Sequence, residues 1–358
     1  MSLESSFESS LAASQALHLP RAGRQAPPPE AAASAPGLSR GALAGLLRFA
    51  GLLALLAVVA FFAVRVPSFL TPGNIGLILS QSAVLGILGL GLTLVLITGG
   101  SDVIRGGIDL SLAGTLGLAA AVFATLNQAG YGDAACVAAT LATGLAVGAL
   151  NALSVTWLRI LPLLATLAVM NICAGLELVL TENTTVPAAA PLIDALNLAG
   201  PFDLPVIGLV LVAAWLVLAV TLRFTPVGLR AYAVGGHPEA ARAAGIALNR
   251  YVAGSYIVAG LLGGVAGILS VAFLNAATSG SADMLLPVIA TAFLGRMFSR
   301  RLVPSVTGTL LAAVFLGALA NGFQLLHVSS YWVNGIEGAL ILAVVGVTSG
   351  LAQRGARP

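Results

Sequence analysis

Long apolar runs separated by short polar connections dominate the chain from residue 44 to residue 349. A helix that crosses the hydrocarbon core of a bilayer needs about 20 mainly apolar residues. Ten segments reach or approach this length: 44–64, 75–98, 110–127, 135–157, 161–181, 205–222, 252–275, 284–296, 303–325 and 331–349. The pattern therefore predicts an all-α, polytopic membrane protein with about ten transmembrane helices.

The segments outside these runs differ in composition. Residues 1–42 are rich in Ala, Ser and Pro, and such a stretch buries too little apolar surface to order itself. We expect a disordered tail at 1–42, a membrane domain at 43–350 and a short tail at 351–358. A long polar connection interrupts the membrane domain at about 224–251.

Positive charge predicts how the helices are oriented. All sixteen cationic residues are arginine, and positive side chains favour the cytoplasmic ends of membrane helices. With ten crossings and a cytoplasmic N-terminus, only Arg65 falls outside, whereas the external loops carry Asp133, Glu182, Asp194, Asp203 and Asp283. Fifteen arginines fall inside: Arg21, Arg24, Arg40, Arg48, Arg105, Arg159, Arg223, Arg230, Arg242, Arg250, Arg296, Arg300, Arg301, Arg354 and Arg357. Both termini are therefore predicted to be cytoplasmic.

The eighth segment, 284–296, is short for a crossing. An apolar run of 10–14 residues is more typical of a re-entrant or half helix. If it did not cross, every arginine after it would move to the outer face, against the charge pattern. We therefore predict that it crosses, alone or together with the residues just before it.

Composition supports a membrane protein and limits its chemistry. The chain is 58% hydrophobic and 8% charged, whereas a soluble domain is about 25% charged. It has no lysine, so it lacks the residue by which a Walker A loop reaches ATP phosphates. Cys136 and Cys173 lie in apolar runs, and the three histidines are far apart, which favours packing roles over a metal or catalytic site. We expect no enzyme active site, no bound cofactor or metal, and no nucleic-acid partner.

The polar connection Thr225–Arg250 contains a predicted short helix at 238–244. Pro238 suits the first helical position, and Glu239 and Arg242 place their charges favourably at the two ends of the helix dipole. Gly245 is the residue that favours a left-handed stop. Two interpretations are open: a solvated connection between two spans, or a helix that docks onto a soluble partner.

Several polar side chains lie at membrane depth. Amides there are most often hydrogen-bond partners between helices. The asparagines among them are candidates to line a modestly polar, largely uncharged path, which would suit a neutral hydroxylated solute: Asn151, Asn171, Asn275 and Asn321. For Glu177, near the outer end of its span, a water-facing position and a pathway role are both open.

The polar connection also carries a motif. Residues 232–242 read YAVGGHPEAAR, followed by Ala244-Gly-Ile, and this resembles the cytoplasmic YAxGGNxxAAxxSGI motif of ribose-type ABC sugar permeases. His237 replaces the usual Asn, and Ala244 the usual Ser. A second match is the GGIDLS element, here Gly106, Gly107, Ile108, Asp109, Leu110 and Ser111. Between this element and an earlier Gly pair, the chain carries the extra residues 101–105.

The resemblance, to the branched-chain amino acid/ribose permease family, covers about residues 45–350 and implies a division of labour. The chain would be the permease domain, 43–350, of an importer in the bacterial cytoplasmic (inner) membrane. A cytoplasmic ABC ATPase would bind ATP and Mg, a second permease chain would complete the pathway, and an extracytoplasmic protein would deliver a sugar. The loop at about 224–251 would couple the chain to the ATPase. The docking residues implied are Tyr232, Gly235, Gly236, His237, Pro238, Glu239, Ala240, Ala241, Arg242 and Gly245.

A second function class stays open. A secondary transporter or channel for a small neutral solute would need no ATPase. Coupled carriers generally show paired buried acids or broken helices at an ion site, and the scarcity of acids in the spans speaks against this class. The residues alone do not name the solute.

Overall fold

The computed structural model describes residues 40–100, 107–200, 204–299 and 303–329, with isolated positions between 332 and 339; for residues 40–50 only the backbone is described. From residue 44 on, the described residues form one compact unit. The predicted tails, the extra residues 101–105 and nearly all of the tenth predicted span lie outside the described residues.

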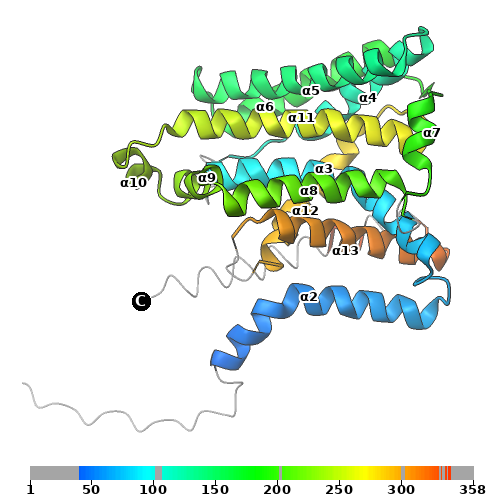
Figure 1. The fold of residues 1–358 in the computed structure, drawn as a ribbon, viewed down its shortest axis with the longest axis horizontal. Coiled ribbons are helices and arrows are strands. Elements are labelled where there is room, and N and C mark those ends of the chain that lie inside the picture. The colour runs from blue at the N-terminus through cyan, green and yellow to red at the C-terminus, as the bar shows by residue number, and fades with distance from the viewer. Residues whose placement is uncertain are drawn as a thin grey trace, which may run out of the picture. The chain divides into compact units, whose positions relative to one another are not determined.

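A helix corresponds to each of the first nine predicted spans (Figure 1). They are α2 (Arg40–Arg65), α3 (Pro72–Gly99), α4 (Leu112–Gln128), α5 (Asp133–Thr156), α6 (Pro162–Thr181), α8 (Val206–Phe224), α11 (Leu248–Leu274), α12 (Leu285–Met297) and α13 (Val306–Leu325). The connections contain shorter elements: β1 (Val186–Pro187), α7 (Pro191–Asn197), α9 (Pro226–Gly236), α10 (Pro238–Ala243), β2 (Ala276–Ala277) and the 3₁₀ helix η2 (Ser281–Met284). Of these, only α10 was predicted from the sequence.

Six helices of the described part are long and apolar enough to span a membrane: α3, α5, α6, α8, α11 and α13. The chain is thus a multi-pass membrane protein, while a total of about ten crossings stays a prediction. The helix of the eighth segment, α12, has only 13 residues, and η2 directly precedes it. At about 1.5 Å per residue α12 alone measures roughly 20 Å, so a crossing would need the preceding residues, as the sequence suggested.

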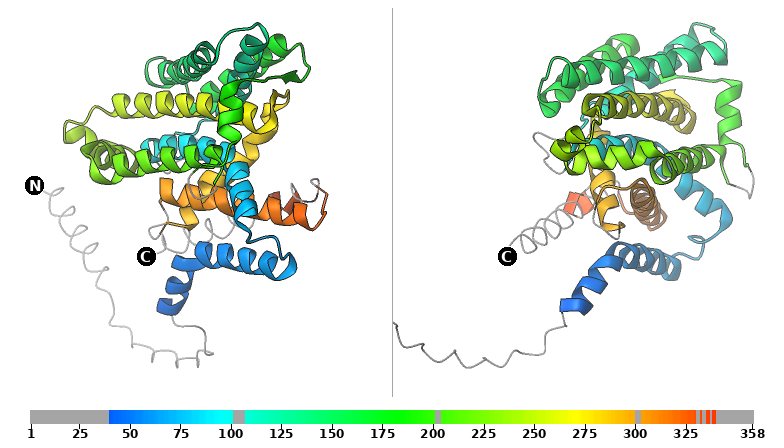
Figure 2. Two further views of the ribbon diagram at one scale, coloured as in Figure 1. Left: turned by 45° about the vertical axis from the view of Figure 1, so that its right-hand side comes forward. Right: turned by 60° about the vertical axis from the view of Figure 1, so that its left-hand side comes forward.

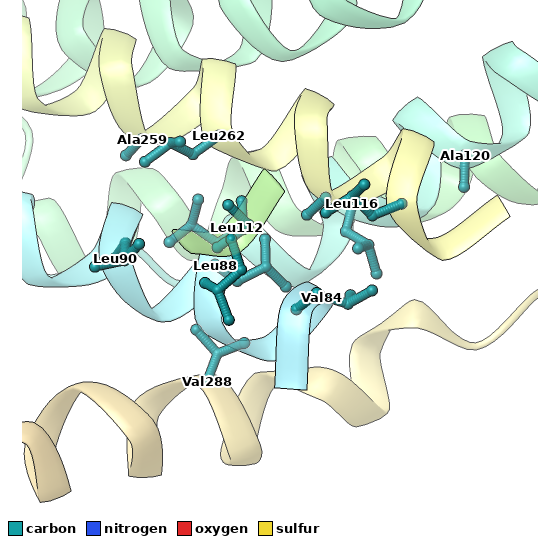
Figure 3. Close-up of a cluster of buried hydrophobic side chains, with 14 of the residues drawn as sticks. Val84, Leu88, Leu90, Leu112, Leu116, Ala120, Ala259, Leu262 and Val288 are labelled. Carbon is teal, nitrogen blue, oxygen red and sulfur yellow. The ribbon is translucent and has the colours of Figure 1, made fainter. Parts of the chain in front are cut away.

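The long helix α3 lies at the centre of the bundle and contacts α4, α8, α9, α11, α12 and α13. Its apolar side chains are buried on nearly all sides. Leu88 and Leu90 of α3, Leu112 of α4, Leu262 of α11 and Val288 of α12 belong to the largest buried cluster (Figure 3). A helix that is apolar all round is expected in such a position.

Glycines allow α5 and α11 to approach closely. A methyl group added at Gly144 would collide with the backbone of Gly260 and Gly264, and one added at Gly148 would meet the Tyr256 carbonyl oxygen at 2.6 Å. Small residues permit such backbone contact where lipid provides no hydrophobic drive for helices to associate. These glycines therefore let α5 and α11 pack backbone against backbone.

The two ends of the bundle differ in charge. Both sets of views place α9 and α10 at one end and α7 at the other (Figures 1 and 2). At the α7 end, Asp133 Oδ2 accepts a hydrogen bond from the Leu192 N–H at 2.9 Å, and β1 pairs with β2. We call the α9–α10 end the arginine end, because Arg223 closes α8 there and Arg250 lies in the first turn of α11.

Candidate functional site

The predicted docking segment starts where α8 ends. Thr225 caps α9: its hydroxyl oxygen accepts a hydrogen bond from the Val227 N–H at 3.2 Å, and Pro226 takes the first helical position. The connection 224–251 is therefore largely helical. The sequence did not reveal α9, because a capping threonine followed by proline is also common at the end of a preceding helix.

Two of the predicted docking residues fix α9 to the bundle. The Tyr232 hydroxyl donates to the Pro304 carbonyl oxygen at 3.0 Å. Burial raises the pKa of the Tyr232 phenol, so this group stays a donor at neutral pH. Gly235 lies directly on the last turn of α3, where an added methyl group would collide with the Ile97 carbonyl and meet the Gly100 nitrogen at 3.1 Å. Both residues therefore act inside the chain, and Gly235 must be glycine for α9 to approach α3.

The predicted helix at 238–244 is present as α10, with Pro238 at its first position, Glu239 in its first turn and Arg242 in its last. Gly245 has φ of 78°, the left-handed conformation expected for the stop. The Ile246 N–H closes the end by donating to the Ala241 carbonyl oxygen at 3.0 Å. Most docking candidates point to solvent here: Gly236, His237, Pro238, Glu239, Ala240, Arg242 and Gly245.

Ala241 differs from its neighbours. Its side chain is 4% exposed, so it packs inside the chain and does not form part of a surface for a partner. From the sequence alone, Ala240, Ala241, Ala243 and Ala244 could not be distinguished. In the structure Ala240 is exposed and Ala241 is buried, because successive helical residues point about 100° apart.

A buried polar network lies beside the last turn of α3. Asp109 Oδ1 accepts from the Ser111 N–H at 2.9 Å and from the Ser111 hydroxyl at 2.6 Å, and Asn151 Nδ2 donates to Ser111 Oγ at 2.7 Å. Two further residues hold the segment in place: the Leu110 N–H donates to Thr166 Oγ1, and the Tyr256 hydroxyl donates to the Ile108 carbonyl oxygen. The network joins α5, α6 and α11 to the start of α4.

Two atoms of this network lack a partner. Asp109 Oδ2 and Asn151 Oδ1 are buried and accept no hydrogen bond from any residue in the described part of the chain. A methyl group added at Gly107 would lie only 2.6 Å from the Val95 carbonyl oxygen, so the segment packs directly against α3. Gly106, the first residue of the predicted motif, lies outside the described residues. The motif thus shapes an irregular stretch inside the bundle, which membrane proteins tolerate only where its backbone is surrounded by protein or lines a cavity.

A second acidic group is buried between α4 and α6. Glu177 of α6 is 2% exposed, and its Oε2 accepts a short hydrogen bond from the Ser281 hydroxyl of η2. Its Oε1 has no partner. Gly117 of α4 leaves the space for this contact, because any side chain there would collide with both groups. The water-facing position that was open for Glu177 is therefore excluded.

The four asparagines predicted for a path lie in different places. Asn151 belongs to the network of Asp109, beside the last turn of α3. Asn321 lies near the opposite end of α3, where its Oδ1 accepts a hydrogen bond of 2.9 Å from Asn74 Nδ2 in the first turn of that helix. Asn171 is exposed and bonds to its own helix, and Asn275 is an exposed residue in the left-handed conformation that ends α11. The structure does not bring the four together in one path. The amide pairs that it does form, Asn74–Asn321 and Gln81–Gln324, join α3 to α13, as expected for amides in helix contacts.

Some residues that form hydrogen bonds between helices carried no signal in the sequence. Tyr256, which bonds to Ile108, and Ser255, which bonds to Thr98 of α3, look like ordinary residues of an apolar span, and Asn74 looks like a residue at a helix start. Their partners are far away in the chain, so only the fold identifies them. In the described part of the chain no group of three His, Cys, Asp or Glu side chains is placed to hold a metal ion.

The chain is similar to known transport proteins. The model of a family described as branched-chain amino acid transport system / permease component matches residues 74–345. The ribose import permease protein RbsC of Escherichia coli (strain K12) is 35% identical over 84% of this chain and 94% of its own length. RbsC of Bacillus subtilis (strain 168) is 32% identical over 83% and 90%. The autoinducer 2 import system permease protein LsrC of Enterobacter sp. (strain 638) is 31% identical over 86% and 89%. No solved structure matches.

Proposed function

The chain belongs to the branched-chain amino acid transport system / permease component family, and from this premise we propose that it is the membrane subunit of an ABC importer. The solute would be a sugar or a similar neutral hydroxylated molecule, because the named relatives import ribose or autoinducer 2. ATP and Mg would be bound by a separate ATPase subunit, since this chain has no lysine for a P-loop.

One observation supports this proposal most directly. At the arginine end, α10 presents an exposed surface of small and charged side chains, and α9, which contacts α10, packs on the last turn of α3 through Gly235. A helix that must transmit the movement of a partner to a membrane bundle needs both properties. The arginines of this end further support a cytoplasmic orientation, with both termini on the cytoplasmic side of the bacterial inner membrane.

The other partners follow from the same family. A second permease chain, identical or different, would complete the pathway, and an extracytoplasmic solute-binding protein would deliver the solute to the α7 end. That end carries the acidic residues Asp133, Asp194 and Asp283.

Co-purification with the ATPase tests the docking role. We expect Ala240→Trp, which adds a bulky side chain to the exposed face of α10, to reduce recovery of the ATPase and uptake at unchanged expression. Overpacking at a contact costs about 1–3 kcal/mol, which is roughly a fivefold to hundredfold loss of affinity. Ala189→Trp, at an exposed alanine of the opposite, α7 end, is the matched control for ATPase recovery. Ala241→Trp is unsuitable as a test, because that side chain is buried within the chain itself.

An ion-coupled carrier is the alternative, and one observation favours it. Asp109 and Glu177 are both buried and each retains an oxygen without a partner, although the sequence suggested few buried acids. Uptake measured in cells that lack the ATPase separates the two classes. Uptake that continues without any ATPase partner, and that stops when the proton gradient is dissipated, would contradict the importer proposal.

A further inference from the structure

A crevice opens at the arginine end between α8 and α11, beneath α9. Its volume is about 890 Å³. The last turns of α3 and α8 form its base and one wall, the first turns of α11 form the other wall, and α9 with the turn after α10 covers its outer side. Its position is thus between the bundle and the docking segment.

The walls of the crevice are mainly apolar, and the hydroxyls of Thr98, Ser255 and Thr221 already have partners, which leaves Tyr251 and the two arginines as the polar side chains of the lining without a hydrogen-bond partner among the described residues. Thr98 and Ser255 share a hydrogen bond of 2.8 Å at its base, and the Thr221 hydroxyl donates to the Val217 carbonyl oxygen. The lining residues Val227 and Leu229 are 50% and 76% exposed, which is unfavourable in water for two large apolar side chains. A hydroxylated solute would find few free hydrogen-bonding groups here, whereas a hydrocarbon chain would find an apolar surface.

The charged lining residues are two arginines, Arg230 of α9 and Arg250 of α11. Neither forms an ion pair with an acidic residue in the part of the chain that the structure describes, and no acidic side chain is among the described residues that line the crevice. Guanidinium groups bind phosphate through paired N–H donors. Basic pockets between membrane helices on the cytoplasmic side are typical sites for anionic lipid headgroups.

We propose that this crevice binds an anionic phospholipid, with the phosphate held by Arg230 and Arg250 and an acyl chain lying along the apolar wall between α8 and α11. The lipid would then fill the space beneath α9 and support the position of α10. Because this lipid contacts only this chain, the proposal goes beyond the transport function and holds whether or not the ATPase docking is correct.

The test uses the purified full chain in nanodiscs of phosphatidylcholine with one part in ten of phosphatidylglycerol, and measures the lipid retained after transfer to mild detergent by native mass spectrometry. We expect the wild-type chain to retain phosphatidylglycerol in preference to phosphatidylcholine. The double variant Arg230→Gln/Arg250→Gln should lose that preference by about tenfold or more, since each basic residue contributes to anionic lipid binding. Arg223→Gln is the matched control, because Arg223 is an exposed arginine of the same end that does not line the crevice.

A second variant tests the apolar wall while keeping both arginines. Gly254 lines the crevice, and a methyl group added there meets no atom within 4 Å. Gly254→Phe should therefore fold normally and occupy the space of the acyl chain, so that retained phosphatidylglycerol falls. Gly175→Phe, at an equally open glycine of α6 that does not line the crevice, should retain the lipid as the wild type does.

Three results would overturn the proposal. Equal retention of phosphatidylglycerol by all variants would show that the lipid binds elsewhere. Displacement of the lipid by millimolar inorganic phosphate alone would identify a free-anion site without an acyl chain. Loss of ATPase recovery in Gly254→Phe with unchanged lipid retention would show that a protein partner fills the crevice.

Discussion

Replacing Asp109 by Asn should leave the stability of the protein nearly unchanged, whereas replacing it by Ala should lower it. Asp109 Oδ1 accepts both hydrogen bonds from Ser111, and Oδ2 is buried without a partner. An asparagine keeps the accepting oxygen and places a donor where the unpaired oxygen lies. Asn151 Oδ1, which is also buried and unpaired, belongs to the same network and is the natural acceptor for that donor.

The expected magnitudes follow from the hydrogen bonds. Asp109→Ala leaves the buried Ser111 N–H without its acceptor, at a cost of about 1–3 kcal/mol, and the lost side-chain volume adds to this. A loss of about 2 kcal/mol lowers the melting temperature of a large domain by roughly 4 °C. Asp109→Asn should stay within about 1 kcal/mol of the wild type, since no buried group loses a partner.

Thermal unfolding of the purified variants, followed by the fluorescence of a reporter dye, measures the difference, with uptake in cells at matched expression as the second readout. Ser111→Ala serves as a control, because it removes the hydroxyl that accepts from Asn151 Nδ2 and should also destabilise the chain. If Asp109→Asn unfolds at the same lowered temperature as Asp109→Ala, the negative charge, and not the geometry of the carboxyl group, holds the network, and this reasoning is refuted.

Three further predictions concern other parts of the chain. Gly144→Leu should abolish the close contact of α5 with α11 and reduce the yield of folded protein, whereas Gly175→Leu, at an open position, should not; size-exclusion profiles of both variants decide this. Gly245→Val should strain the left-handed stop of α10, so that uptake falls while membrane insertion, measured by immunoblot of membrane fractions, is unchanged. A single cysteine at position 240, in a chain whose native cysteines are replaced, should not react with an impermeant thiol reagent in intact cells; labelling from outside would refute the cytoplasmic orientation of α10.

Much of the helical framework could be predicted from the sequence, because apolar runs of membrane length leave little choice of structure. The short helix at 238–244 was also predictable from its local signals, since proline, the two end charges and Gly245 act within a few residues of each other. In contrast, α9 was missed, because its sequence mixes apolar and polar residues without a clear period and its stability comes from packing on α3.

The candidate site was predictable only in part. The motif at 106–111 was found, but the hydrogen bonds that Thr166 and Tyr256 make to it were not predicted, because hydrogen bonds between residues far apart in the chain depend on the fold. The four asparagines were grouped by residue type and depth alone. Which side of a helix faces a neighbour decides their environment, and a helix that is apolar on all sides gives no indication of that side.

The uninterrupted helix α3 has a mechanical consequence. It has 28 residues and is roughly 42 Å long at about 1.5 Å per residue. Its last turn touches Gly235 of α9, and its first turn is tied to α13 through Asn74 and Asn321. A movement of α9 at one surface of the membrane would therefore reach α13 at the other surface through one continuous helix. Gly86, Gly89 and Gly91 lie between these two contacts, so we expect the stiffness of this glycine-containing middle part of α3 to decide how much of the movement arrives.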